Sequence, residues 1–191
     1  MPGSRVFISE SDLNFRRRLK DILIHSGYLI IGESSSGKHT LQMVSRLDPT
    51  LIILEHRLPG SEDLDIAEII GGQMIAPVVL TVDARRQDVD ELVRKTGVYG
   101  VLSRTLLEAS ILPVLETAIA GFERVTDLQK QVVELRKKLY ERRLVEQAKG
   151  LLMESKGFTE EQAYRYMRHL SMDNCLPLAK IARNIVMAAQ R

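Results

Sequence analysis

Short apolar runs separated by amphipathic segments make up the first half of the chain. Five runs rich in β-branched and aliphatic residues predict strands, at Arg5–Ser9, Tyr28–Glu33, Leu51–Leu54, Pro77–Thr81 and Gly100–Ser103. Between them, apolar residues near helical spacing predict helices, at Leu13–Ser26, His39–Leu47, Ile66–Ile70 and Arg86–Thr96. Strands that alternate with helices predict an α/β fold with a doubly wound, five-stranded parallel sheet.

The strand pattern stops after Leu106, and a long helical pattern replaces it. Apolar residues follow one another at steps of 3, 4, 3 and 4, at Val125, Leu128, Val132, Leu135 and Leu139. This a/d spacing is typical of a coiled coil and predicts a helix that reaches about Ser155 and pairs two copies of the chain. The alternative is that the apolar seam packs on the chain's own last helices.

Two further helices complete an all-helical tail. Thr159 and Gln162 have the spacing of a capping box and predict a helix start at Thr159. A last helix is expected over Leu178–Ala189, after a break at Asp173–Pro177. The chain is therefore expected to divide into an α/β domain at 1–121, a coiled-coil linker helix at 122–143 and a helical module at 144–191.

Composition indicates the compartment in which the chain is expected more clearly than it indicates the function. Its 191 residues carry 27 Lys and Arg against 25 Asp and Glu, a formal net charge of +2 that does not by itself demand nucleic acid. No apolar run approaches the roughly 18 residues of a membrane span, and no secretory signal pattern is visible. Cys175 is the single cysteine, so we expect no disulfide and a cytoplasmic protein without a membrane partner.

Polar residues follow the carboxyl ends of four predicted strands, where doubly wound sheets bind ligands. Glu10 and Ser11 follow the first, Glu55 ends the third, Thr81 the fourth and Arg104 follows the fifth. Over about residues 4–121, this pattern resembles the receiver domain of two-component response regulators, a flavodoxin-like fold. The resemblance implies a pocket in which an acidic pair and a strand-three aspartate bind Mg²⁺, and in which that aspartate accepts a phosphoryl group.

Three substitutions distinguish this pocket from the family pattern. Glu55 stands at the phosphoacceptor position with its carboxylate one methylene further out, where a misplacement of about 1 Å can cost a hundredfold in rate. Ser11 removes a charged ligand of the metal, and Arg104 replaces a lysine. We therefore expect a pseudo-receiver that holds no metal or other cofactor. Glu55 and Arg104 are expected to form an ion pair, which either mimics an activated pocket or marks a decayed one.

A second resemblance covers about residues 130–190. The string Ala148–Met153, the step Glu161–Tyr164 and the pair Ser171-Met172 occur in order at suitable spacing. They resemble the ANTAR module, the RNA-binding domain of bacterial transcription antitermination regulators. The resemblance implies recognition of stem-loops in nascent leader transcripts, and it places Lys149 on the first helix of the module as the strongest single candidate for RNA contact.

Residue types in the tail are compatible with RNA binding. Basic side chains attract phosphate, and exposed tyrosines can stack on unpaired bases. Each also has a plainer explanation, as a solvated helix face or a partly buried ring. The remaining candidates besides Lys149 are Arg142, Arg143, Tyr164, Arg165, Arg168, Lys180 and Arg183.

The leading hypothesis is an antitermination regulator that binds leader-transcript hairpins as a homodimer. The alternatives are a conventional phosphorylation-controlled response regulator and a regulator that a protein partner sequesters through the receiver-like domain. We do not expect an enzyme. Gly32–Lys38 has the glycine spacing of a phosphate-binding loop, but His39 replaces the required Ser or Thr, so a surface loop is expected there.

Overall fold

The chain folds into two compact units, Met1–Thr126 and Asp127–Arg191. The computed structural model describes residues 3–61, 65–83, 88–105 and 108–189. Each unit has its own hydrophobic core. None of the helices in the described ranges is long and apolar enough to cross a bilayer.

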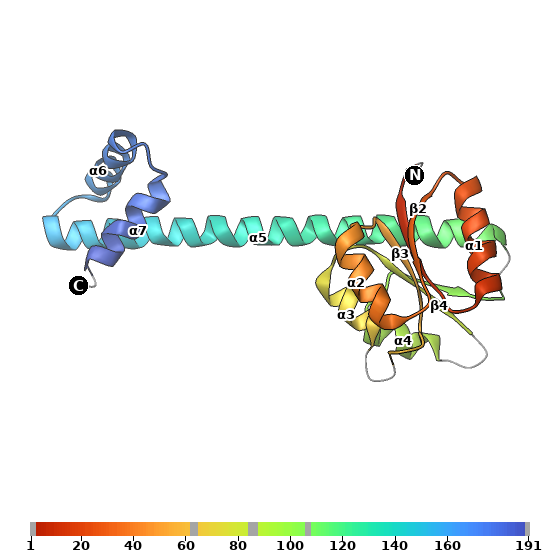
Figure 1. Cartoon of the computed structure of the whole chain (residues 1–191). Helices are drawn as coiled ribbons and strands as arrows, with labels where there is room; N and C mark the ends of the chain where they lie inside the picture. Colours follow the sequence, from red (N-terminus) through yellow and green to blue (C-terminus); the bar gives the residue numbers. More distant parts are fainter. Residues whose placement is uncertain (1–2, 62–64, 84–87, 106–107, 190–191) are drawn as a thin grey trace. The chain divides into compact units, whose positions relative to one another are not determined.

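The N-terminal unit is built on a five-stranded parallel sheet in the order β2-β1-β3-β4-β5 (Figure 1). This order confirms the predicted flavodoxin-like α/β fold. Its strands are β1 (Arg5–Ser9), β2 (Leu29–Ser34), β3 (Leu51–Glu55), β4 (Val78–Val82) and β5 (Gly100–Ser103). Its helices are α1 (Leu13–His25), α2 (Gly37–Leu47), α3 (Ile66–Gln73), α4 (Val89–Thr96), a 3₁₀ turn η1 (Glu108–Ser110) and the start of α5 (Ile111–Lys156).

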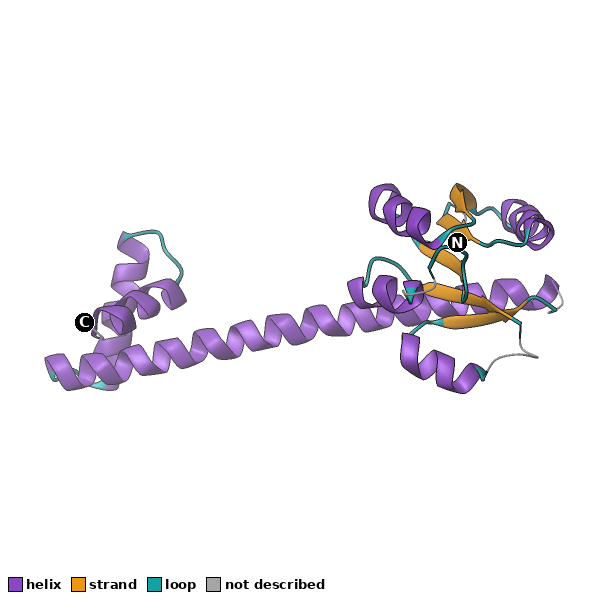
Figure 2. Cartoon of the chain, turned by 60° about the horizontal axis from the view of Figure 1, so that its bottom comes forward, coloured by secondary structure: helices purple, strands orange, loops and turns teal. Residues whose placement is uncertain are grey.

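Helices lie on both faces of the sheet (Figure 2). Alternate residues of the central strands contribute to two cores, one on each face. Ile53 of β3 packs with residues of α1 and α5, whereas Ile52 and Leu54 pack with residues of α2, α3 and α4. All five residues of β3 are buried, as expected for a central parallel strand. The carboxyl end of this rigid strand therefore holds Glu55 in a fixed place.

Helix α3 is longer than the sequence predicts. The predicted helix ends at Ile70, before Gly71-Gly72, but the observed helix continues through both glycines to Gln73, and Met74 follows in the left-handed conformation with φ 51°. A Cβ on Gly71 would lie 3.1 Å from the carbonyl oxygen of Thr96 at the end of α4. The glycine therefore serves close packing between two helices rather than chain termination.

The C-terminal unit combines the end of α5 with α6 (Glu160–Asp173) and α7 (Leu178–Ala189). The predicted capping box is present, because Thr159 and Gln162 exchange hydrogen bonds between side chain and backbone. The buried core residues of this unit are Leu144, Ala148, Leu152, Ala163, Met167, Ile181, Ala182 and Val186.

The apolar seam of α5 is left uncovered. Every residue from 127 to 140 is exposed, and Leu128, Val132, Leu135 and Leu139 retain between 46% and 63% of their surface. The C-terminal helices instead pack on Leu144, Ala148 and Leu152. The alternative in which the seam packs on the chain's own last helices is therefore wrong.

Candidate functional site

The sheet brings the five predicted pocket residues together at its carboxyl edge. Glu10 is fully buried and Thr81 nearly so, while Glu55 is buried at the end of β3. Thr81 donates a 2.6 Å hydrogen bond to Oε2 of Glu10. Ser11 is exposed and contributes its backbone N–H, which donates to Oε2 of Glu55 at 2.7 Å. The pocket is thus crosslinked by groups of the chain itself.

Arg104 bridges the two carboxylates. Its Nη2 lies 2.5 Å from Oε1 of Glu55 and also donates to Oε1 of Glu10. The expected ion pair with Glu55 is confirmed, and the second contact with Glu10 was not anticipated. Together with Thr81 and two backbone N–H groups, Arg104 gives every oxygen of both carboxylates a partner. Buried carboxylates need such pairing to offset their desolvation.

The charges of the pocket influence one another. Burial raises the pKa of Glu10, and the nearby charge of Glu55 adds to this, although the Thr81 hydrogen bond and Arg104 oppose it. Burial alone lowers the pKa of Arg104, but the hydrogen bond to Glu55 and the charges of both carboxylates outweigh burial and raise it. A permanently charged guanidinium therefore stands between two acids.

The residues present do not fit the Mg²⁺ of a receiver pocket. Oxygens of Glu10 and Glu55 that would face a metal already accept hydrogen bonds from Arg104, a cation. Ser11 supplies no carboxylate, although hard divalent cations prefer charged oxygen ligands. The described residues contain no cluster of three or more His, Cys, Asp or Glu that could hold a metal.

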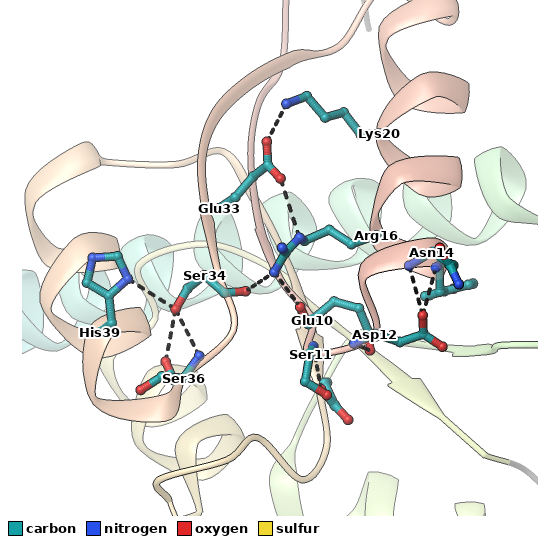
Figure 3. Close-up of polar contacts among 12 residues, drawn as sticks. Glu10, Ser11, Asp12, Asn14, Arg16, Lys20, Glu33, Ser34, Ser36 and His39 are labelled. Carbon is teal, nitrogen blue, oxygen red and sulfur yellow. Dashed lines mark hydrogen bonds and ion pairs between the residues drawn. The ribbon is translucent and has the colours of Figure 1, made fainter.

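Arg16, which sequence reasoning missed, anchors the loop that carries Glu10 (Figure 3). Its Nη1 donates to the carbonyl oxygens of Glu10 at 2.8 Å and Ser34 at 3.3 Å. Its Nε lies 3.5 Å from Glu33, which also pairs with Lys20. Asp12 caps α1 by accepting from two backbone N–H groups of its first turn. The basic run Arg16–Arg18 was the available signal, but only the fold shows that one member points to this loop.

His56 lies beside the pocket and was not singled out from the sequence. A cavity of about 200 Å³ is lined by Glu55, His56, Arg57, Thr81, Val82, Asp83 and Arg104. Nδ1 of His56 is buried without a hydrogen-bond partner among the described residues. Burial lowers the pKa of His56. The positive charges of Arg57 and Lys95 lower it further, whereas the charge of Asp65 acts in the opposite direction.

The segment Gly32–Lys38 does not form the surface loop that we expected. Gly32 and Glu33 belong to β2, and Gly37 and Lys38 begin α2. A Cβ on Gly32 would meet the side chains of Leu47 and Phe7 within 3 Å, and one on Gly37 would meet Ser61. These glycines are explained by close packing in the N-terminal unit, not by a phosphate.

Lys149 is placed differently from the other RNA candidates. It is only 8% exposed, and its Nζ lies 2.7 Å from Glu146 and 2.6 Å from Glu160. These hydrogen bonds raise the pKa of Lys149. Because Glu160 opens α6, Lys149 fastens the start of α6 to α5.

The other candidates lie on the surface of the C-terminal unit. Arg165 pairs with Glu161 one helical turn earlier, and Tyr164 is 43% exposed. Five of these candidates, Arg142, Arg143, Arg168, Lys180 and Arg183, are exposed and have no ion pair among the described residues. Tyr166, by contrast, packs its ring against Phe158 and beneath Lys156.

Comparisons with known proteins give a family match within the C-terminal unit and relatives along more of the chain. The model of the ANTAR domain matches residues 133–186. The transcriptional regulatory protein PdtaR of Mycobacterium tuberculosis is 30% identical over 182 residues, which cover 95% of this chain and 89% of that protein. The aliphatic amidase regulator of Pseudomonas aeruginosa is 30% identical over 88 residues, which cover 46% of this chain and 45% of that protein.

Solved structures support the fold of the N-terminal unit. The signal receiver domain of a diguanylate cyclase from Desulfovibrio desulfuricans aligns with a TM-score of 0.56 and 20% identity, covering 63% of this chain and 97% of that one. The receiver domain of the sensor histidine kinase PA1611 from Pseudomonas aeruginosa aligns with a TM-score of 0.54 and 17% identity. This alignment covers 62% of this chain and 98% of that one. With a PdtaR relative along nearly the whole chain and an ANTAR match at its end, the chain belongs to the ANTAR-type antitermination response regulators, which join a receiver domain to an ANTAR domain.

Proposed function

We propose that this chain binds stem-loop RNA in nascent leader transcripts through its C-terminal unit and so prevents a terminator from forming. The observation that carries the proposal is the exposure of five candidate cations, Arg142, Arg143, Arg168, Lys180 and Arg183, within the residues that match the ANTAR domain. Such cations release counterions from RNA phosphates on binding, and the exposed ring of Tyr164 offers a surface on which a loop base can stack.

We assign Lys149 an indirect part in this binding. Its ammonium is occupied by Glu146 and Glu160, so it holds α6 in position rather than presenting a free charge to phosphate. Arg165 forms an ion pair with Glu161 and is therefore the weakest of the exposed cationic candidates for phosphate contact. In this proposal, residues 144–191 form the RNA-binding module, 122–143 the linker helix and 1–121 the receiver-like domain. Arg142 and Arg143, at the end of the linker helix, add two cations next to the module.

The receiver-like domain, in this proposal, works without phosphoryl transfer. Glu55 keeps both carboxylate oxygens in hydrogen bonds with Arg104 and Ser11, which leaves neither oriented as a free nucleophile. The pairing of every carboxylate oxygen of Glu10 and Glu55 favours a fixed charge arrangement over a decayed one. A conventional phosphorylation-controlled regulator would need the Mg²⁺ that the pocket does not fit.

The experiment that tests RNA binding uses the full chain and a pool of RNAs with two stem-loops whose loop bases are randomised. After selection, the enriched RNA, a version with one stem-loop and a duplex DNA of equal length are titrated across a salt series. We expect enrichment of defined loop sequences and weaker binding to one stem-loop, because two linked sites gain avidity. Equal binding to all three ligands that vanishes with salt would mean generic electrostatics and would overturn the proposal.

A further inference from the structure

The uncovered seam of α5 has residue types that suit a second copy of the chain. Val125, Val132 and Leu139 occupy the a positions, and Leu128 and Leu135 the d positions, so that two of the three a residues are β-branched. β-branched residues at a with leucine at d favour parallel, two-stranded coiled coils. Because residues 127–140 are exposed and the C-terminal core lies on Leu144 and later residues, this face is free to pair.

The charges beside the seam oppose the same pairing. Acidic residues of this stretch, Asp127, Glu134 and Glu141, all fall at c positions on the outer face. The e and g positions beside the seam hold only basic or neutral residues, which are Arg124, Gln129, Gln131, Arg136, Lys138 and Arg143. A seam between copies therefore carries no attractive pair of opposite charges at its edges.

One contact is directly repulsive. In a parallel pair, each g residue faces the e residue five positions later on the other helix, so Lys138 would face Arg143 of the second copy, twice in the dimer. Lys138 shares its charge with Glu134 at 2.7 Å, but Arg143 and its neighbour Arg142 have no ion pair among the described residues. Arg142 also takes the d position after Leu139 and ends the apolar seam with a charge.

We propose that the seam pairs two copies in parallel, and that the cationic strip formed by Lys138, Arg142 and Arg143 keeps this pairing weak until RNA phosphates neutralise it. The inference rests on the proposed function, because RNA is the polyanion concerned. Binding of RNA and pairing of the chains then favour each other by the same factor, as linked equilibria must. Added salt, which screens like charges near the surface, should strengthen pairing of the free protein.

The charge effect is tested without RNA, by sedimentation equilibrium of the full chain at low and high salt. Arg143→Glu turns two repulsive contacts into two attractive ones, whereas Lys137→Glu makes the same change of net charge at an outer f position. We expect Arg143→Glu to dimerise about tenfold more tightly than Lys137→Glu at low salt, as pairwise charge effects on helices add up. A wild-type dimer that is tight and insensitive to salt would overturn the proposal, and so would tightening by Arg136→Glu instead, which would indicate an antiparallel pair.

The coupling to RNA is tested with a one-stem-loop version of the enriched RNA, because a two-stem-loop RNA would gather two copies on one template. We expect complexes that contain two chains and two RNAs at protein concentrations where the free chain is monomeric. Complexes of one chain with one RNA throughout would refute the coupling and leave the proposed function standing. Failure to bind any RNA would refute the proposed function, while the Arg143→Glu comparison would still report on the seam.

Discussion

Nη2 of Arg104 lies 2.5 Å from Oε1 of Glu55. The same nitrogen donates to the buried Glu10. The guanidinium of Arg104, which follows β5, therefore bonds to the residue after β1 and to the last residue of β3. Arginine suits this bridge because its planar, permanently charged fork can serve two carboxylates at once. The pocket is therefore closed by an internal cation.

Removing this cation should destabilise the N-terminal unit. Arg104→Met leaves Glu10 buried beside Glu55 without a counter-charge, and breaking a buried pair in this way costs about 3 kcal/mol, less where water reaches the group. Because the side chain of Arg104 is 29% exposed, we expect a loss of about 1–3 kcal/mol, measured by calorimetric unfolding. Adding Glu10→Gln to Arg104→Met should recover part of it, since the amide can still bond Thr81; no recovery would contradict the assigned role of Glu10.

The pocket should regain phosphoryl chemistry when the three family residues return. The triple variant Ser11→Asp, Glu55→Asp, Arg104→Lys restores a second acid, a shorter acceptor and a slimmer cation. We expect mass spectrometry after incubation with acetyl phosphate and Mg²⁺ to show one added phosphoryl group on the triple variant and none on the wild type. The matched control is the triple variant with Asn in place of Asp at position 55, which should stay unmodified. Modification of the wild type at Glu55 would contradict this account.

Stability of the N-terminal unit should fall on mild acidification because of His56. Burial lowers the folded-state pKa of His56 below its ordinary 6.5, so the unfolded chain binds a proton first as the pH falls. The stability that neutral His56 confers is therefore present above about pH 6.5 and is lost below it. We expect the melting temperature of wild type to drop more between pH 7.5 and 5.5 than that of His56→Gln. An equal drop in both proteins would assign the pH dependence to other groups.

Substitutions of Lys149 and of Arg168 should weaken RNA binding in different ways. Arg168 is exposed and should lose a phosphate contact in Arg168→Gln, which lowers the slope of log affinity against log salt by about 0.7–0.9. Lys149→Ala removes the ties to Glu146 and Glu160, so we expect weaker binding with an unchanged slope. A slope that falls equally in Lys149→Ala would mean that Lys149 contacts phosphate directly.

Local sequence patterns were sufficient for most of the fold. The strands β1 and β5 and the helix α7 have the bounds that periodicity and turn residues predict, because each is decided by residues within it. Helix α3 was predicted too short, since the tolerance for Gly71 comes from its packing against α4. Tertiary contacts override local preferences in such places.

Only part of the candidate site could be predicted from the sequence. Strand ends locate Glu55 and Arg104 at one edge of a parallel sheet, so their pairing could be predicted. The second bond of Arg104 to Glu10 and the anchor Arg16 depend on side-chain directions that no periodicity reveals. Lys149 was the strongest candidate for RNA contact on its family resemblance, and no local pattern revealed its partner Glu160, which is 11 residues away on another helix.

The most direct test of the account is a titration of the wild-type chain with the enriched two-stem-loop RNA, with and without acetyl phosphate at a constant concentration of Mg²⁺. Because Glu55 is held by Arg104 and Ser11, we predict the same dissociation constant under both conditions. Tightening by tenfold or more that requires the phosphodonor would contradict the account and indicate a working receiver.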